Sequence, residues 1–181
     1  MEALGKKKAM PVYGKAEEER NRILLAPVYG ARILLVEDNE INQQVAEEIL
    51  SEAGFIVDIA DNGQIGVEMV EASQSSSPNK SQSAYQIVLM DIQMPELDGY
   101  AAARKIRASH SYASLPIVAM TANAMASDRL KSTEAGMNDH IPKPIDTQVL
   151  FEALAKWIPQ TGYVAVARAP ISADKSSSAS K

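Results

Sequence analysis

Residues 85–98 read YQIVLMDIQMPELD, an apolar run that ends abruptly in a carboxylate and a loop. The run from Ile87 to Met90 is short, continuous and rich in branched side chains, which is typical of a strand covered on both faces of a parallel sheet. Pro95 and an Asp-Gly pair then indicate a loop before the next helix. Ligands of open α/β sheets bind beyond the carboxyl ends of the strands, so Asp91 is a candidate for chemistry.

Four further segments predict strands: 33–36, which reads as a buried strand, 56–60, 115–121, and a very short strand at 140–141. Segments with helical spacing lie between and after them, at 41–53, from 63 onward, 100–109, 127–135 and 147–158. Five strands that alternate with five helices specify an α/β fold with a doubly wound parallel sheet. Right-handed crossovers favour the strand order 2-1-3-4-5. In that order the first and third strands are neighbours, and Asp38 and Asp91 are expected to face each other across one crevice.

Two of the helices are marked by apolar residues. In the first helix Ile41, Val45, Ile49 and Ala53 recur at helical spacing. In the last helix we expect Val149, Leu150, Leu154 and Trp157 to be buried. The helix around Leu130 has a thin apolar face, which fits an element that can shift.

Composition restricts the class of protein. At 181 residues, 46% hydrophobic and 23% charged, the chain suits one globular domain with irregular ends. The absence of cysteine excludes disulfides, thiolate metal sites and a cysteine nucleophile. A net charge of -5 with scattered basic residues argues against a nucleic-acid surface. No apolar run approaches the roughly 20 residues that span a bilayer, and no signal peptide is apparent, so we expect a cytoplasmic setting without membrane contact. A membrane-anchored parent chain would fit the same sequence.

The expected organisation has three parts. Residues 1–30 are expected to be a linker or helical extension, and residues 31–159 the folded domain. Within that domain, 73–84 (SQSSSPNKSQSA) offers no core face and is expected to be a flexible insertion. Residues 160–181 are expected to be a disordered tail.

Three carboxylates, those of Glu37, Asp38 and Asp91, are expected to converge at the strand ends. Like charges that lie so close either raise a pKa or recruit a cation. Oxygen ligands without histidine or cysteine favour Mg²⁺. Thr121 and Lys143 lie at the ends of the fourth and fifth strands and offer a hydroxyl and an ammonium group. A metal, an ammonium and a hydroxyl around one carboxylate are what phosphoryl transfer to Asp91 requires.

Each of these residues, taken alone, also has a simpler interpretation. Asp38 and Asn39 are common helix N-caps at a strand-to-helix turn. Thr121 alone would be a strand former and Lys143 a solvated side chain. Asp91 alone would fit a turn or a cap. Their positions at adjacent strand ends favour the functional interpretation.

Four separated segments resemble the receiver domain of two-component response regulators, and especially the receivers of hybrid sensor histidine kinases. They are LLVEDN (34–39), LMDIQMPELDGY (89–100), MTANA (120–124) and KPID (143–146). The resemblance covers about residues 32–158 and places the motifs in the family's order. It implies a flavodoxin-like (βα)5 receiver fold.

The resemblance also implies roles for the acidic residues. Asp91 would be the phospho-acceptor, and Asp38 and Asp91 would bind Mg²⁺ together with the backbone carbonyl of Gln93. Glu37 would act mainly through a metal-bound water. These assignments are carried over residue by residue from the family's motifs.

Further roles implied by the resemblance concern the other strand ends. Thr121 would swing to bond a phosphoryl oxygen, and Lys143 would pair with another. His140 occupies the position of the family's rotamer switch, which is often aromatic. Gln93 and Asn123 occupy positions that tune the lifetime of the phosphoryl group. The bond between Lys143 and its following proline resembles the family's cis peptide.

The expected function is that of a signalling module and not of an enzyme, although a hybrid histidine kinase parent would be one. The sequence contains no phosphate-binding Gly-x-x-x-x-Gly-Lys-[Ser/Thr] loop and no kinase ATP-binding segment, so the donor would be a phosphohistidine of a partner. That partner would be a histidine kinase, a histidine phosphotransfer protein, or both.

Two other functions remain open at this point. An aspartyl-nucleophile phosphohydrolase of the haloacid-dehalogenase type uses the same chemistry, but it needs an acid two residues after the nucleophile, where this chain has Gln93. An inactive receiver-like scaffold would have lost a site residue, and none is lost.

Overall fold

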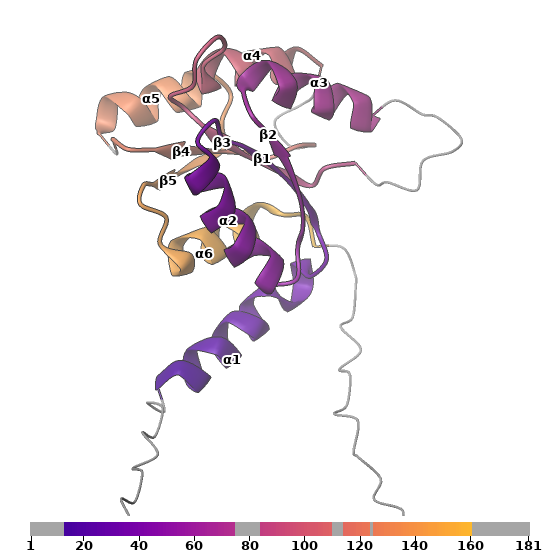
Figure 1. Cartoon of the computed structure of the whole chain (residues 1–181), viewed down its shortest axis with the longest axis vertical. Coiled ribbons are helices and arrows are strands. Elements are labelled where there is room, and N and C mark those ends of the chain that lie inside the picture. The colour runs from indigo at the N-terminus through magenta and orange to yellow at the C-terminus, as the bar shows by residue number, and fades with distance from the viewer. Residues whose placement is uncertain (1–12, 75–83, 110–113, 124, 161–181) are drawn as a thin grey trace, which may run out of the picture.

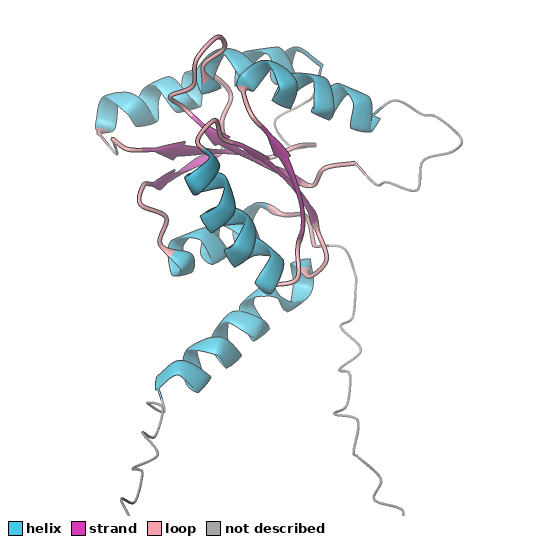
Figure 2. Cartoon of the chain, viewed as in Figure 1, coloured by secondary structure: helices cyan, strands magenta, loops and turns pink. Residues whose placement is uncertain are grey.

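A parallel sheet of five strands forms the centre of the molecule, with the strands in the order β2-β1-β3-β4-β5 (Figures 1 and 2). The computed structural model describes residues 13–74, 84–109, 114–123 and 125–160. The strands are β1 (Arg32–Val36), β2 (Ile56–Ala60), β3 (Ile87–Asp91), β4 (Ile117–Thr121) and β5 (Asp139–Pro142). The predicted doubly wound α/β fold and its strand order are therefore confirmed.

Helices cover both faces of the sheet. They are α1 (Tyr13–Leu25), α2 (Glu40–Glu52), α3 (Gly63–Gln74), α4 (Gly99–Ser109), α5 (Ala126–Glu134) and α6 (Thr147–Trp157). Figure 1 shows α3, α4 and α5 on one face, and α2 and α6 with α1 on the other. Alternate residues of β1 divide between the layers: Ile33 and Leu35 pack in the α2–α6 core, and Leu34 and Val36 in the α3–α4 core. This double coverage explains why the central strands β1, β3 and β4 are buried along their whole length, whereas the edge strands β2 and β5 are partly exposed. No helix of the described segments is long and apolar enough to cross a membrane.

The apolar row of α2 that indicated a helix is exposed at its N-terminal end. Ile41 is 71% exposed and Val45 is 48% exposed, whereas Ala46 and Leu50 are buried against the sheet. An α-helix has 3.6 residues per turn, so a row of residues spaced by four winds gradually around the helix and leaves the buried face. Two apolar side chains are consequently exposed on the helix that follows β1.

The predicted buried face of α6 is wrong at one position. Val149 is 37% exposed, and Phe151, which the prediction omitted, is 7% exposed. Leu150 and Leu154 are buried as predicted, and Trp157 packs at the edge of the same core.

The N-terminal segment packs on the domain through its C-terminal end. α1 is followed by a 3-10 turn, Ala26–Val28, and Leu25 and Val28 are buried in the core that α2 and α6 share. The ring of Tyr29 lies against Gly54, which has a φ of +91° and at which a Cβ atom would collide with that ring. Residues 25–31 are therefore part of the packed domain, and only the N-terminal part of α1 extends away from it (Figure 1).

The expected insertion and tail fall mostly outside the described residues. α3 continues to Gln74, two residues into the predicted insertion, and residues 75–83 are not described. Of the expected tail only residue 160 is described.

Candidate functional site

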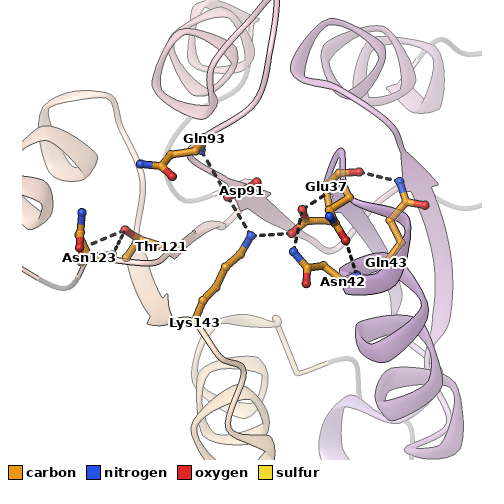
Figure 3. Close-up of polar contacts among 9 residues, drawn as sticks. Glu37, Asn42, Gln43, Asp91, Gln93, Thr121, Asn123 and Lys143 are labelled. Carbon is orange, nitrogen blue, oxygen red and sulfur yellow. Dashed lines mark hydrogen bonds and ion pairs between the residues drawn. The ribbon is translucent and has the colours of Figure 1, made fainter.

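Four of the predicted site residues lie at the carboxyl ends of adjacent strands (Figure 3). Glu37 follows β1, Asp91 is the last residue of β3, Thr121 is the last residue of β4, and Lys143 follows β5. The parallel register brings these ends to one edge of the sheet, because β1 pairs with β3, β3 with β4, and β4 with β5. This edge is where open α/β sheets bind ligands.

The three acids form a compact cluster. Glu37, Asp38 and Asp91 each offer a carboxylate oxygen, and these oxygens lie within 4.8 Å of one another. Glu37 is 1% exposed and Asp91 is 4% exposed, whereas Asp38 is open to solvent. Two buried acids and one accessible acid could hold a hard divalent cation that keeps part of its water shell, as Mg²⁺ does. The donor set therefore fits the metal that the sequence predicts.

Lys143 bridges the two buried carboxylates. Its Nζ atom lies 2.7 Å from Oε2 of Glu37 and 3.1 Å from Oδ1 of Asp91. Burial lowers the pKa of Lys143, but the hydrogen bonds and charges of the two acids outweigh burial, and the net pKa is raised. The peptide bond from Lys143 to Pro144 is cis, as the resemblance implies.

Asp91 is held in an environment that disfavours its charge. Burial raises the pKa of its carboxyl group, and the neighbouring charge of Glu37 raises it further. Lys143 and the backbone N–H of Gln93, which donates to Oδ1 at 3.3 Å, act in the opposite direction without reversing the shift. A cation that approached this carboxylate would relieve both unfavourable effects.

Thr121 is adjacent to the cluster, but its hydroxyl group is engaged elsewhere. It donates to the carbonyl of Asn123 at 2.9 Å and accepts the backbone N–H of Asn123 at 3.1 Å. Thr121, Asn123 and Gln93 line one hollow of about 300 Å³, together with Tyr100 and Lys131. The predicted phosphoryl-binding hydroxyl therefore belongs to a local turn in this state.

His140 does not join this group of residues. It pairs with Ala119 in the β4–β5 ladder, two positions before the strand ends. Its imidazole lies 3.7 Å from the carboxylate of Asp139, and its backbone N–H donates to the same carboxylate at 2.9 Å. Among the described contacts none joins His140 to Thr121 or Lys143.

Sequence reasoning missed Asn42 and Gln43, two amides in the first turn of α2. Asn42 Nδ2 donates to Oε1 of Glu37 at 3.3 Å, and Gln43 Nε2 donates to the Glu37 carbonyl at 2.6 Å. The available signal was their position three and four residues after the N-cap Asn39, where side chains can reach back to the strand end.

Comparison with known proteins decides the family. A model of the response regulator receiver domain matches residues 33–155. The chain belongs to the receiver domain family. This receiver is 36% identical over 146 residues to "Probable histidine kinase 2" of Oryza sativa subsp. indica, a match that covers 77% of the chain and 13% of the kinase. It thus spans only a small part of that relative's length.

Two solved receivers are also similar. One is the receiver domain of sensor histidine kinase PA1611 from Pseudomonas aeruginosa PAO1, crystallised with a magnesium ion in its active site cleft; it is 39% identical with a TM-score of 0.58, covering 71% of this chain and 98% of that one. The other is the receiver domain of Ssk1 in complex with the Saccharomyces cerevisiae histidine phosphotransfer protein Ypd1, at 28% identity and a TM-score of 0.61, covering 72% and 90%. This receiver is therefore a module of the two-component phosphorelay type.

Proposed function

We propose that this receiver domain takes a phosphoryl group onto Asp91 from a partner's phosphohistidine, in a reaction that depends on Mg²⁺. The observation that carries the proposal is the bridge of Lys143 between Glu37 and Asp91 beside an acidic cluster. One ammonium group and three carboxylates at adjacent strand ends supply a nucleophile, a mobile cation and a metal site in one place.

In the transfer step a carboxylate oxygen of Asp91 attacks phosphorus while the bond from phosphorus to the donor's imidazole nitrogen breaks. The imidazole is protonated on its other ring nitrogen, so it keeps the electron pair of the broken bond and leaves as a neutral group. The ammonium group of Lys143 moves from the carboxylate of Asp91 to an oxygen of the incoming phosphoryl group. Its flexible side chain allows this change of partner. The raised pKa of Asp91 reflects how poorly its charge is balanced before the transfer.

The residues that would hold the metal are Asp38, Asp91 and the backbone carbonyl of Gln93, with Glu37 contributing from the outer shell. When bound, Mg²⁺ neutralises the charge that develops on the phosphoryl oxygens. Asp38 is the exposed member of the cluster, and we propose that the donor approaches the site on its side.

Phosphorylation of Asp91 would then change the hydrogen bonds of Thr121. To bond a phosphoryl oxygen, its hydroxyl group must leave the carbonyl of Asn123, which frees the turn between β4 and α5. α5 buries only Ser132 and leaves Met125, its N-cap, 68% exposed and Leu130 61% exposed. Such a weakly packed helix can respond to a small change at its N-terminal turn.

The exposed side of α2 is the docking surface that we propose for the phosphohistidine partner. Ile41 and Val45 are accessible there, one turn beyond the acidic cluster. A groove next to this side of α2 is lined by four acids. Two come from α2 and two follow the ends of β1 and β2: Glu40, Glu47, Asp38 and Asp61. An apolar patch with an acidic border fits a helical partner with a basic border, and the partner class is a histidine phosphotransfer protein or a histidine kinase.

Incubation with acetyl phosphate and Mg²⁺ tests the proposal. Intact mass spectrometry should find one phosphoryl group per chain, removable by hydroxylamine and absent from Asp91→Asn. An adduct that persists in this variant would place the acceptor elsewhere. Steady release of phosphate without an adduct would favour a phosphohydrolase, and the absence of any reaction would favour an inactive scaffold.

A further inference from the structure

We propose that Asn42 and Gln43 are positioning residues that hold Glu37 in the geometry a divalent cation needs. The inference rests on the proposed function, because it concerns the metal site beside Asp91. It assigns a task to the first turn of α2 that the four sequence motifs do not describe.

Both oxygens of the Glu37 carboxylate have donors, and the donors come from different parts of the chain (Figure 3). Oε1 accepts from Asn42 Nδ2 at 3.3 Å and from the backbone N–H of Asn39 at 3.2 Å. Oε2 accepts from Lys143 Nζ at 2.7 Å. The side chain of Glu37 is 2% exposed, so a donor that is replaced by an apolar side chain of the same volume leaves no room for water to take its place.

Gln43 holds the backbone of the same residue. Its Nε2 atom donates to the carbonyl of Glu37 at 2.6 Å and to Oδ1 of Asp61 at 3.0 Å. Asp61 directly follows β2, so one amide ties the ends of two neighbouring strands together. This tie fixes the point at which the chain leaves β1 and presents Glu37 and Asp38.

The N-cap of α2 determines where these amides lie. Asn39 Oδ1 accepts the backbone N–H groups of Ile41 and Asn42, which starts the helix immediately after the acidic pair. The side chains of Asn42 and Gln43 are therefore in the first turn of α2, close to the end of β1. Each of the two contacts joins residues only five or six positions apart.

Neutral amides suit this task better than charged groups. An amide N–H orients a carboxylate without cancelling its charge, and the cluster keeps its attraction for a cation. Lys143 also holds Glu37, but it must turn toward the phosphoryl group during transfer. Asn42 and the Asn39 N–H then remain as the donors that keep the Glu37 carboxylate in place.

Titration calorimetry with Mg²⁺ on the whole chain tests the inference. Asn42→Leu keeps the volume and removes the donor. Losing a partner of a direct metal ligand usually costs about 10-fold or more in metal affinity. Glu37 itself acts from the outer shell, so we expect a smaller effect, with Mg²⁺ bound about 3-fold to 10-fold more weakly. Gln43→Met should also weaken Mg²⁺ binding. Gln44→Met is the matched control, because Gln44 is exposed on the same helix and none of the hydrogen bonds of the described residues joins it to Glu37. The Mg²⁺ affinity of this variant should equal that of the wild type.

A second readout separates positioning from general stability. The rate of phosphorylation by acetyl phosphate should fall in Asn42→Leu at low Mg²⁺ and recover at saturating Mg²⁺, because the defect lies in metal affinity. Wild-type Mg²⁺ affinity in both Asn42→Leu and Asn42→Ala, even with a lowered urea midpoint, would overturn the inference. If the wild type itself bound no Mg²⁺, the proposed function would fail first, so the two failures are distinguishable.

Discussion

Replacement of Lys143 by Met removes the cation that separates two buried carboxylates and keeps a stem of similar length. The side chains of Glu37 and Asp91 are 2% and 6% exposed, and that of Lys143 is 20% exposed. Loss of one partner costs about 3–5 kcal/mol for a fully buried pair and about 0–1 kcal/mol for an exposed one. Because Lys143 lies between these limits, we expect the metal-free variant to lose about 2 kcal/mol of its free energy of unfolding at neutral pH.

Mg²⁺ should reverse this loss, because the metal neutralises the two acids and the lysine no longer competes for them. Full recovery of about 2 kcal/mol corresponds to an affinity for Mg²⁺ about 30-fold higher than that of the wild type. We therefore expect Lys143→Met to bind Mg²⁺ more tightly, while its response to phosphorylation weakens.

Urea unfolding followed by Trp157 fluorescence measures both effects, in chelator and in saturating Mg²⁺. Trp157 is a suitable probe because its Nε1 donates to Asp139 Oδ2 at 2.8 Å, an interaction that unfolding breaks. Lys105→Met is the control, since Lys105 is exposed and its partner is the neutral Gln64, and it should change stability by less than about 0.5 kcal/mol. Equal urea midpoints for Lys143→Met and the wild type in chelator would refute the reasoning, as would equal stabilisation of both by Mg²⁺.

Three further substitutions test other parts of the structure. Asp91→Asn should make the metal-free protein more stable than the wild type at neutral pH. The pKa of Asp91 is raised above 3.8 in the folded state, so the free energy of unfolding of the wild type falls as pH rises from about 3.8 through the raised pKa. Urea midpoints measured across pH should show this fall in the wild type and not in the variant. Gly99→Ala should cost about 1–3 kcal/mol and slow phosphorylation, because the added Cβ would collide with the backbone carbonyl of Asp91; a normal rate and urea midpoint would contradict this. Leu25→Ala should cost about 2–5 kcal/mol in thermal or urea unfolding, while Ile23→Ala, at a site 66% exposed, should be nearly neutral; equal effects would show that the N-terminal segment is not part of the core.

The central strands and the placement of the site were readable from the sequence, because both depend on local pattern. The continuous apolar run before Asp91 indicated a strand covered on both faces, and its abrupt end marked the edge where polar residues gather. With the right-handed crossover rule, the five predicted strands favoured the order that the sheet has, and hence indicated which acids would be neighbours.

The faces of the helices were decided by tertiary packing. The row that includes Ile41 and Val45 has helical spacing, but its N-terminal end turns away from the sheet, since the sheet is already contacted by Ala46 and Leu50. Likewise, nothing in the pattern of residues 1–30 showed that Leu25 would enter the core, because that depends on the space left between α2 and α6.

The contacts within the site also required the structure. Lys143 and Glu37 are 106 residues apart in sequence, and the 2.7 Å between their charged atoms follows from how β1, β3, β4 and β5 lie side by side. The sequence determined which chemical groups stand at the strand ends. Only the packed sheet decided which of them touch: Lys143 lies on two acids, the Thr121 hydroxyl is turned into its own loop, and Asn42 holds Glu37. Side-chain partners depend on distances between elements that no local periodicity encodes.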